Sequence, residues 1–228
     1  MIPTVFTCEG QDVSLVHKPN SRAKRLSLRL SSKEGLFVLT TPPRATTSQI
    51  NAFLKQCTPW IKKQVEKLSK SISIEPGADV TLNGEVFRCM VDPLRRKPVL
   101  CKLTQTLRLP PRCMKKDVYE LLKKTAEKIL FPSVLTVADG FGQRVDKITI
   151  RDQKSRWGSC SGRKTISLNW RLILAPPEVA HYVCVHEAAH LLHMNHSSAF
   201  WKVVGDVCPA YQSHKKWLKI NGPSLMRF

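Results

Sequence analysis

The segment His186-Glu187-Ala188-Ala189-His190 constrains this chain more than any other part of its sequence. In an α-helix, residues four positions apart lie one above the other on the same face. His186 and His190 can therefore each direct a ring nitrogen at one metal ion. Glu187 is rotated about a quarter turn away and can reach a metal-bound water without being a ligand. This spacing is typical of helices that build a hydrolytic zinc site.

The residues around this segment favour a buried helix. Pro177 stands where a proline is tolerated in the first helical turn, and no helix breaker follows it for many residues. Apolar side chains continue on most sides of the histidines, so we expect a helix from about Pro177 to His193 or Met194. Five of the seven histidines of the chain lie in or just after this helix: His181, His186, His190, His193 and His196.

A third metal ligand has two candidates, His193 and His196. A straight helix would spread His186, His190 and His193 over about 10.5 Å, at 1.5 Å per residue. Rings at that spacing cannot easily surround an ion whose bonds to nitrogen are about 2.0–2.1 Å long. We favour His196, because Asn195 tolerates a left-handed backbone and can end the helix, so that the chain folds back to the metal. Three neutral imidazoles would leave a fourth position open for water, as in catalytic zinc sites.

Other roles are available to these histidines. A pair of histidines four residues apart can be hydrogen-bonded core residues, but the presence of Glu187 and His196 makes this interpretation the weaker one. The helix dipole favours a histidine at a helix C-terminus, so we assign His193 to the end of the helix rather than to the metal. His181 is assigned a structural or supporting role.

The charge of the chain indicates anionic partners. Its 228 residues include 37 lysines and arginines and 17 acidic residues, which gives a formal net charge of +20. Basic clusters at residues 22–25, 95–97 and 115–116 spread this charge over the sequence. Such a field attracts polyanions, including nucleic acid, nucleotides and anionic membrane surfaces. Each single cluster can equally be a solvated basic surface.

Cysteine spacing and hydropathy favour a reducing compartment. The eight cysteines contain no CxxC pair, so the sequence indicates neither a zinc ribbon nor a disulfide framework. The N-terminus lacks the basic start and apolar run of a signal peptide, and no stretch of about 18 apolar residues could span a membrane. We expect a cytoplasmic protein with free thiols and no membrane span.

The residue pattern predicts an α+β fold with a β-rich N-terminal region, residues 1–112, that contains one helix at about 46–70. Alternation at residues 25–30 and an apolar run at 36–40 predict a hairpin around a turn at 31–35. Short strands follow at about 79–82, 85–91, 99–103 and 106–109. Asn83-Gly84 predicts a tight hairpin turn between the first two of them.

Residues 113–228 are predicted to form the metal-binding domain. A helix at about 113–138 is expected to pack behind the active-site helix. Strands at 147–152 and 165–173 bracket a loop at 154–163, and two further helices are expected near 198–207 and 211–220. The tryptophans at 157, 170 and 201 are expected in the core rather than at a substrate site.

Several stretches beyond the HExxH segment are similar to one known family. They read RDQKSRWGSC at 151–160, ISLNWRL at 166–172 and NHSSAFW at 195–201, with further similarity at 22–26 and 60–61. On these residues the chain resembles the YgjP-like metallopeptidases, a branch of the zincin peptidases that is related to SprT-like proteins. The resemblance implies a zincin-like C-terminal domain in which the HExxH helix packs against a backing helix and a small mixed sheet. It also implies one zinc ion per chain.

The ligand set and mechanism that we expect agree with this resemblance. The three ligands would be His186, His190 and His196. Zinc lowers the pKa of its bound water toward about 7, and Glu187 would act as general base in a metallopeptidase that cleaves polypeptides. Resemblance to zincins suggests that strand 165–168 serves as a sheet edge that pairs with an extended peptide.

Three residues are candidates for binding the substrate or stabilising its negative charge. They are Lys154, Arg156 and Tyr211. Lys154 and Arg156 carry positive charge in the loop before the second strand, and the Tyr211 hydroxyl could donate to an oxyanion. A structural ion pair is the alternative role for Arg156.

Two other functions remain open. A metal-dependent pyrophosphohydrolase of a nucleoside triphosphate, of the UTP type, is also implied by the resemblance, and Arg151, Lys154 and Arg156 would suit a polyphosphate. The sequence contains no glycine-rich phosphate loop, which argues against it. A non-enzymatic nucleic-acid-binding protein with a structural metal is the second alternative, but no helix-turn-helix or finger signature supports it. The basic surface also allows a peptidase that acts on protein bound to nucleic acid, as SprT-like relatives do.

Overall fold

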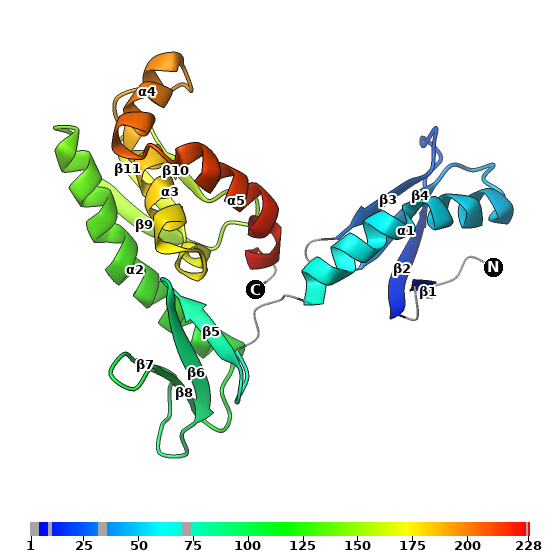
Figure 1. Cartoon of the computed structure of the whole chain (residues 1–228), viewed down its shortest axis with the longest axis horizontal. Coiled ribbons are helices and arrows are strands. Elements are labelled where there is room, and N and C mark those ends of the chain that lie inside the picture. Colours follow the sequence, from blue (N-terminus) through cyan, green and yellow to red (C-terminus); the bar gives the residue numbers. More distant parts are fainter. Residues whose placement is uncertain (1–4, 9–10, 32–35, 70–73, 227) are drawn as a thin grey trace. The chain divides into compact units, whose positions relative to one another are not determined.

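The computed structural model describes residues 5–8, 11–31, 36–69, 74–226 and 228. The chain divides into two compact units, residues 1–71 with 226–228 and residues 72–225 (Figure 1). The assignment of residues 1–112 and 113–228 to separate domains stays a prediction.

The first unit is a four-stranded sheet with one helix, α1. Its elements are β1 (Val5–Cys8), β2 (Gln11–Pro19), β3 (Ser27–Leu30), β4 (Phe37–Thr41) and α1 (Thr47–Ser69), and the strand order is β1-β2-β4-β3. The core forms where alternate residues of β2 and β4, such as Leu15 and Leu39, meet Ile50, Leu54 and Ile61 on one face of α1. The antiparallel pairing of β3 with β4 confirms the predicted hairpin, although residues 32–35 of its turn lie outside the described residues.

The second unit begins with another four-stranded sheet. Its strands are β5 (Asp79–Leu82), β6 (Glu85–Val91), β7 (Val99–Cys101) and β8 (Thr106–Leu109), in the order β5-β6-β8-β7. The predicted tight turn between β5 and β6 is confirmed, because Asn83 and Gly84 both have a positive φ, 49° and 80°.

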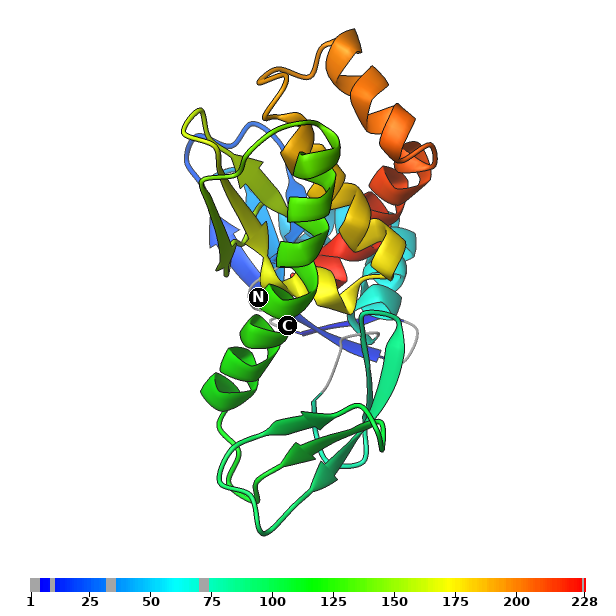
Figure 2. The same cartoon turned by 90° about the vertical axis from the view of Figure 1, so that its left-hand side faces the viewer.

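A three-stranded sheet and the remaining helices complete the second unit. The elements are α2 (Lys115–Gly140), β9 (Lys147–Arg151), β10 (Gly158–Cys160), β11 (Thr165–Asn169), the 3₁₀ helix η1 (Trp170–Leu174), α3 (Pro177–Ala189), α4 (Ser198–Val207) and α5 (Tyr211–Leu225). Helix α3 contacts α2, α4, α5, β10 and η1, so it is the central element of this unit (Figures 1 and 2). The α+β fold and the packing of α2 against the HExxH helix agree with the sequence prediction.

The sheet beside α3 differs from the prediction in two ways. The expected strand 165–173 is wrong beyond Asn169, because the side chain of Asn169 accepts a hydrogen bond from the backbone N–H of Arg171 and starts η1. The strand order β10-β11-β9 also shows that β11 is the central strand. The expectation that residues 165–168 form an open edge is therefore wrong, since β10 pairs antiparallel with them on one side and β9 parallel on the other.

Two expectations about the whole chain can be compared with the described residues. The seven cysteines whose side chains are described are all free thiols, as expected. Within the described part of the chain, none of the helices combines the length and the apolar character that crossing a membrane requires.

The turn between β5 and β6 is fixed against the start of α3. The backbone N–H of Asn83 donates to the carbonyl of Ile173, 2.6 Å away, just before α3 begins. A Cβ atom at Gly84 would lie only 3.0 Å from Cγ of Pro177. This contact couples the first sheet of the second unit to the N-terminus of the central helix.

We expect Gly84→Ala to destabilise the protein more than Gly77→Ala. Both glycines have a positive φ, so each substitution carries a backbone cost of about 1–2 kcal/mol. A methyl group at residue 84 also crowds Pro177, whereas one at residue 77 would meet no atom within 4 Å. Denaturant unfolding of both variants measures the difference, and equal losses would show that the contact with Pro177 contributes nothing.

Candidate metal centre

Three histidine side chains converge at the end of α3. The possible ligand atoms of His186, His190 and His196 all lie within 4.8 Å of one another. The Nε2 atoms of His186 and His196 are 3.1 Å apart. Two nitrogens bound to one tetrahedral ion at about 2.0–2.1 Å would be separated by about 3.3–3.4 Å. The cluster therefore has the spacing that a single metal ion needs, and its donor set of three imidazoles suits zinc.

The chain returns to the cluster by a different route from the predicted one. Helix α3 ends at Ala189, about four residues earlier than expected, and the N–H groups of Leu191 and Leu192 bond to carbonyls three residues back. Among the described non-glycine residues, positive φ angles occur only at residues 83, 105 and 164, so the expected left-handed Asn195 is wrong. The side chain of Asn195 instead accepts from the N–H of Ser197 at 3.3 Å, which begins the turn into α4.

A backbone carbonyl fixes the ring of His190. His190 directly follows α3 and keeps a helical backbone conformation, with φ −67° and ψ −14°. Its ring therefore stays one turn from that of His186. Its Nδ1 lies 3.0 Å from the carbonyl oxygen of His193. When Nδ1 donates to this carbonyl, the lone pair is on Nε2, which is the tautomer that binds a metal. His193 thus takes part through its backbone, and its imidazole is not in the cluster.

Aromatic rings of α4 contact the histidine cluster directly, and one ring of α5 packs against them. Phe200 is fully buried, and its ring centroid lies 4.6–5.0 Å from those of all three histidines. The ring of Trp201 stacks on His196 at 5.7 Å, and Tyr211 stacks on Trp201 at 5.3 Å. Trp201 is half-buried, so the expectation of a core tryptophan describes it only in part. Sequence reasoning missed the support from Phe200.

Glu187 is buried next to this cluster. The residue is only 5% exposed to solvent. Burial raises the pKa of Glu187 to about 8, and the positive charge of Arg156 opposes this shift. The backbone of β10 runs against the carboxylate, since a Cβ atom at Gly158 would lie 2.5 Å from Oε1 of Glu187. Only glycine leaves room for the carboxylate in this position.

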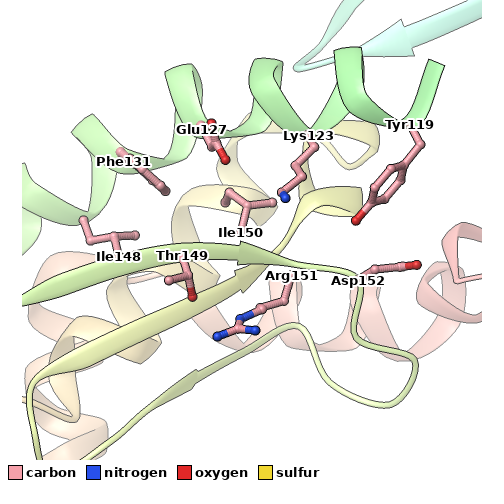
Figure 3. Close-up of a pocket in the computed structure, with 9 residues that line it drawn as sticks. All are labelled: Tyr119, Lys123, Glu127, Phe131, Ile148, Thr149, Ile150, Arg151 and Asp152. Atoms are coloured by element: carbon pink, nitrogen blue, oxygen red, sulfur yellow. The ribbon is translucent and has the colours of Figure 1, made fainter. Parts of the chain in front are cut away.

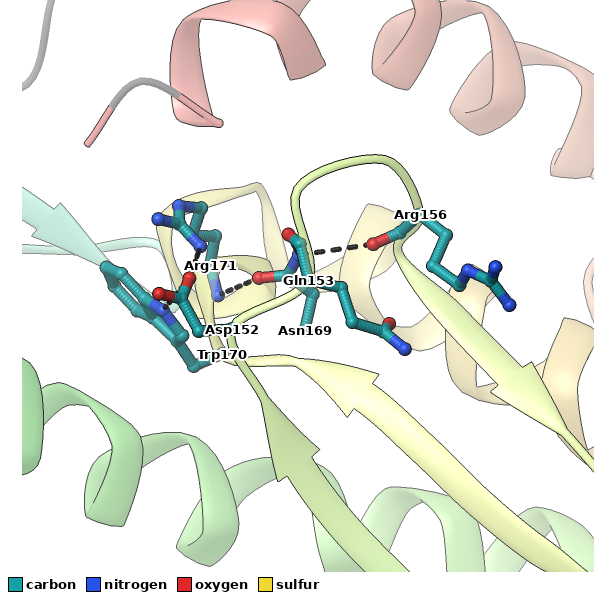
Figure 4. Close-up of polar contacts among 6 residues, drawn as sticks. All are labelled: Asp152, Gln153, Arg156, Asn169, Trp170 and Arg171. Atoms are coloured by element: carbon teal, nitrogen blue, oxygen red, sulfur yellow. Dashed lines mark hydrogen bonds and ion pairs between the residues drawn. The ribbon is translucent and has the colours of Figure 1, made fainter. Parts of the chain in front are cut away.

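A buried asparagine holds the loop that leads into β10. Asn169 is fully buried, and its Nδ2 donates to the carbonyls of Gln153 at 2.6 Å and Arg156 at 3.1 Å (Figure 4). Its backbone N–H donates to the carbonyl of Trp157 at 2.8 Å. These three bonds fix the loop immediately before Gly158, so they determine how closely β10 approaches Glu187.

An ion pair fixes the other end of this loop. Asp152 accepts from the guanidinium of Arg171 and from Nε1 of Trp170, the latter at 3.3 Å (Figure 4). Burial by itself would raise the pKa of Asp152, but the hydrogen bond and charge of Arg171 outweigh it, and the pKa lies below its usual range. Trp170 is buried, as expected. The loop is therefore held at both ends by side chains from β11 and η1.

The predicted substrate-binding residues lie at different distances from the cluster. The exposed side chain of Arg156 points away from the Asp152–Arg171 pair, and it forms no ion pair among the described residues (Figure 4). Its charge nevertheless acts on Glu187. Lys154 is exposed, and its charge acts on Asp152. The ring of Tyr211 stacks on Trp201, which in turn stacks on His196. The roles of these three residues stay predictions.

A pocket of about 340 Å³ opens beside His186 and Glu187. It lies between α3, α5 and the start of β10. Its lining consists of Trp157, Gly158, Tyr182, Val183, His186, Glu187, Lys215, Leu218 and Lys219.

A second pocket, of about 600 Å³, lies between α2 and β9 (Figure 3). Arg151 and Lys123 line it, and none of the three clustered histidines does. Arg151 therefore lines a different cavity from the one beside the histidine cluster. It is a poor candidate for binding a polyphosphate at that cluster.

Comparison with known proteins gives one family and one solved structure. Residues 24–221 match the family model described as YgjP-like, metallopeptidase domain. Among solved structures, the chain is similar to the metallopeptidase zymogen of Pyrococcus abyssi abylysin, with 26% identity and a TM-score of 0.32 over 44% of this chain and 91% of that one. No curated protein matches the chain.

We expect Gly158→Ala to reduce stability by about 1–3 kcal/mol, because the new methyl group must displace the buried carboxylate of Glu187. Gly162→Ala is the matched control, since a Cβ atom there meets no atom within 4 Å. Metal uptake should persist in both variants, because neither change touches the histidines. Unfolding curves and metal analysis measure these effects, and an unchanged stability of Gly158→Ala would contradict the close approach of β10.

Proposed function

Because the chain belongs to the YgjP-like metallopeptidase family, we propose that it is a zinc-dependent peptidase. We assign the metal to His186, His190 and His196, and the role of general base to Glu187. The observation that carries this proposal is the convergence of the three ligand atoms within 4.8 Å, with a buried carboxylate on the same helix. Zinc bound there would polarise a substrate carbonyl and lower the pKa of a bound water.

The environment of Glu187 suits a base. Burial raises its pKa and so makes the carboxylate a stronger base than an exposed one, while a divalent cation nearby would keep it ionised at neutral pH. The carboxylate would accept a proton from the attacking water and pass it to the leaving amine. The close approach of Gly158 restricts the carboxylate to one position during both transfers.

We propose that an extended substrate pairs with β10. β11 cannot serve as the edge, because it is the central strand of its sheet. β10 is the outer strand on the side of Glu187, and a peptide that added to it would pass the carboxylate. Arg156 immediately precedes this region, and its charge would suit a substrate carbonyl that becomes negative in the transition state.

Hydrolysis of a nucleoside triphosphate at the same centre is the second candidate. The presence of Lys215 and Lys219 in the pocket beside Glu187 favours it, since ammonium groups bind phosphate as well as carboxylate. Incubating the zinc-loaded protein in parallel with unfolded protein, DNA-bound protein and the four nucleoside triphosphates discriminates the candidates. Turnover of nucleotides without cleavage of any polypeptide would overturn the peptidase assignment.

We expect Glu187→Gln to lower the rate of peptide cleavage by a factor of about 10²–10⁴, because the amide cannot accept the proton. Zinc content should stay at one ion per chain, since the three imidazoles are unchanged. Zinc analysis and peptide hydrolysis on the same preparation measure both effects. Full activity of this variant would remove Glu187 from the mechanism.

We expect His196→Ala to lose zinc, since only two imidazoles of the cluster remain. His193→Ala is the control, because only the backbone carbonyl of His193 contacts His190. The control should retain zinc at one ion per chain. Metal analysis after dialysis against a weak chelator decides the matter, and stoichiometric zinc in His196→Ala would exclude His196 from the ligand set.

A further inference from the structure

We propose that Lys215 and Lys219 make the pocket beside Glu187 a binding site for a substrate carboxylate, so that the enzyme prefers an acidic residue next to the scissile bond. This inference rests on the peptidase function proposed above and concerns its specificity. The two lysines are four residues apart on α5, so they lie on the same helix face, and both line the pocket.

The walls of the pocket suit a side chain with an apolar stem and a charged end. Tyr182, Val183 and Leu218 are buried apolar residues that line it between the two helices. Trp157 lines it from the side of β10. Its volume of about 340 Å³ is at the lower end of the range for ligand pockets and accommodates one amino-acid side chain.

Helix α5 packs against Trp157, one of the residues that line this pocket. A Cβ atom at Gly222 would lie 2.9 Å from Cζ2 of Trp157, so the backbone of α5 lies directly against the indole. This contact holds α5, and with it both lysines, at a fixed position relative to Glu187.

Lys215 is positioned by an aromatic ring of the metal centre. Its Nζ lies 4.5 Å from the centroid of Trp201, and the same ring stacks on His196. The ammonium group of Lys215 is therefore one ring away from the histidine cluster. Lys219 lies one helical turn further along α5 and lines the same pocket.

The two ammonium groups that line the pocket have no carboxylate partner in the described residues, unlike those of Lys102 and Lys202. Lys102 pairs with Glu85 at 3.5 Å and Lys202 with Asp206 at 2.7 Å. Within the described residues neither Lys215 nor Lys219 forms a salt bridge. Glu187 is the one carboxylate among the residues that line the pocket, and the catalytic centre uses it. A substrate carboxylate would supply the missing partner.

Cleavage of matched peptides tests the preference. Quenched fluorescent peptides that differ only beside the scissile bond would carry Glu, Gln or Lys there, with capped ends. We expect kcat/KM for the Glu peptide to exceed that for the Gln peptide about tenfold, equivalent to about 1.4 kcal/mol. Lys219→Glu should abolish this preference and favour the Lys peptide. Equal rates for the Glu and Gln peptides would overturn the inference and leave the peptidase function intact.

Lys216→Glu is the matched control. Lys216 is exposed on the same helix and does not line the pocket, so the variant makes the same change in net charge one residue from Lys215. It should keep the preference for the Glu peptide. If Lys216→Glu and Lys219→Glu shifted the preference equally, the effect would come from the overall field of the protein, and the pocket assignment would be wrong.

A second arm separates the two sources of a carboxylate. Peptides with an uncharged residue beside the scissile bond and either a free or an amidated C-terminus test whether the chain terminus occupies the pocket. A preference for the free terminus that depends on Lys219 assigns the pocket to a terminal carboxylate, and a preference confined to the Glu side chain assigns it to an acidic residue. The second result supports the proposed preference for an acidic residue, and the first overturns it.

Binding decides the inference without turnover. Fluorescence anisotropy of the labelled Glu and Gln peptides would be measured with zinc-loaded Glu187→Gln, with and without Lys219→Met. Tighter binding of the Glu peptide that is lost with Lys219→Met supports the site even if no peptide is cleaved, in which case only the peptidase function fails. Equal binding of both peptides, or a UTP affinity that alone depends on Lys219, would overturn it.

Discussion

The early end of α3 is the constraint on which the rest of the centre depends. Three imidazoles can meet within 4.8 Å only if the chain reverses between His190 and His196. Backbone groups stabilise this reversal. N–H groups of the turn donate to the carbonyls of the last residues of α3, and the carbonyl of His193 accepts a hydrogen bond from Nδ1 of His190. One short turn thus fixes both the direction of the chain and the orientation of a ring. The first turn of α4 then places Phe200 behind all three histidines.

The position of Glu187 depends on a second set of contacts, remote from the histidines. Asn169 and the Asp152–Arg171 pair hold the loop before β10, and this loop presents the glycine against which Glu187 packs. Burying a carboxylate is unfavourable, which is why the pKa of Glu187 is raised. The backbone of β10 at Gly158 holds the carboxylate of Glu187 in place despite this cost. Ionisable groups with shifted pKa values are commonly concentrated at catalytic sites, which agrees with the role proposed for Glu187.

Much of this arrangement follows from the sequence. The spacing of His186, Glu187 and His190 predicts their common helix, and Asn83-Gly84 predicts the turn of β5 and β6, because both depend on interactions between residues close in the chain. The features that the prediction placed wrongly have two causes, a local side-chain cap and contacts between residues far apart in the chain. The apolar residues after Asn169 fit a strand as well as a 3₁₀ helix, and only the capping side chain distinguishes them. The order of three short strands leaves no local signature, so the edge could not be assigned. The spacing that places Phe200 and Trp201 near the cluster is visible only once the end of α3 is known.

The stacking of Trp201 on His196 has a consequence for how the proposed metal site would assemble. His196 lies on an exposed connection, where a side chain ordinarily samples several rotamers. Stacking of Trp201 on the His196 ring restricts this rotamer freedom before an ion binds. The entropic cost of ordering the side chain is therefore part of folding and not of metal binding. In small zinc domains that unfold without their ion, by contrast, the ligands become ordered only when the metal binds. The proposed metal site would therefore bind and release its ion without unfolding of the chain.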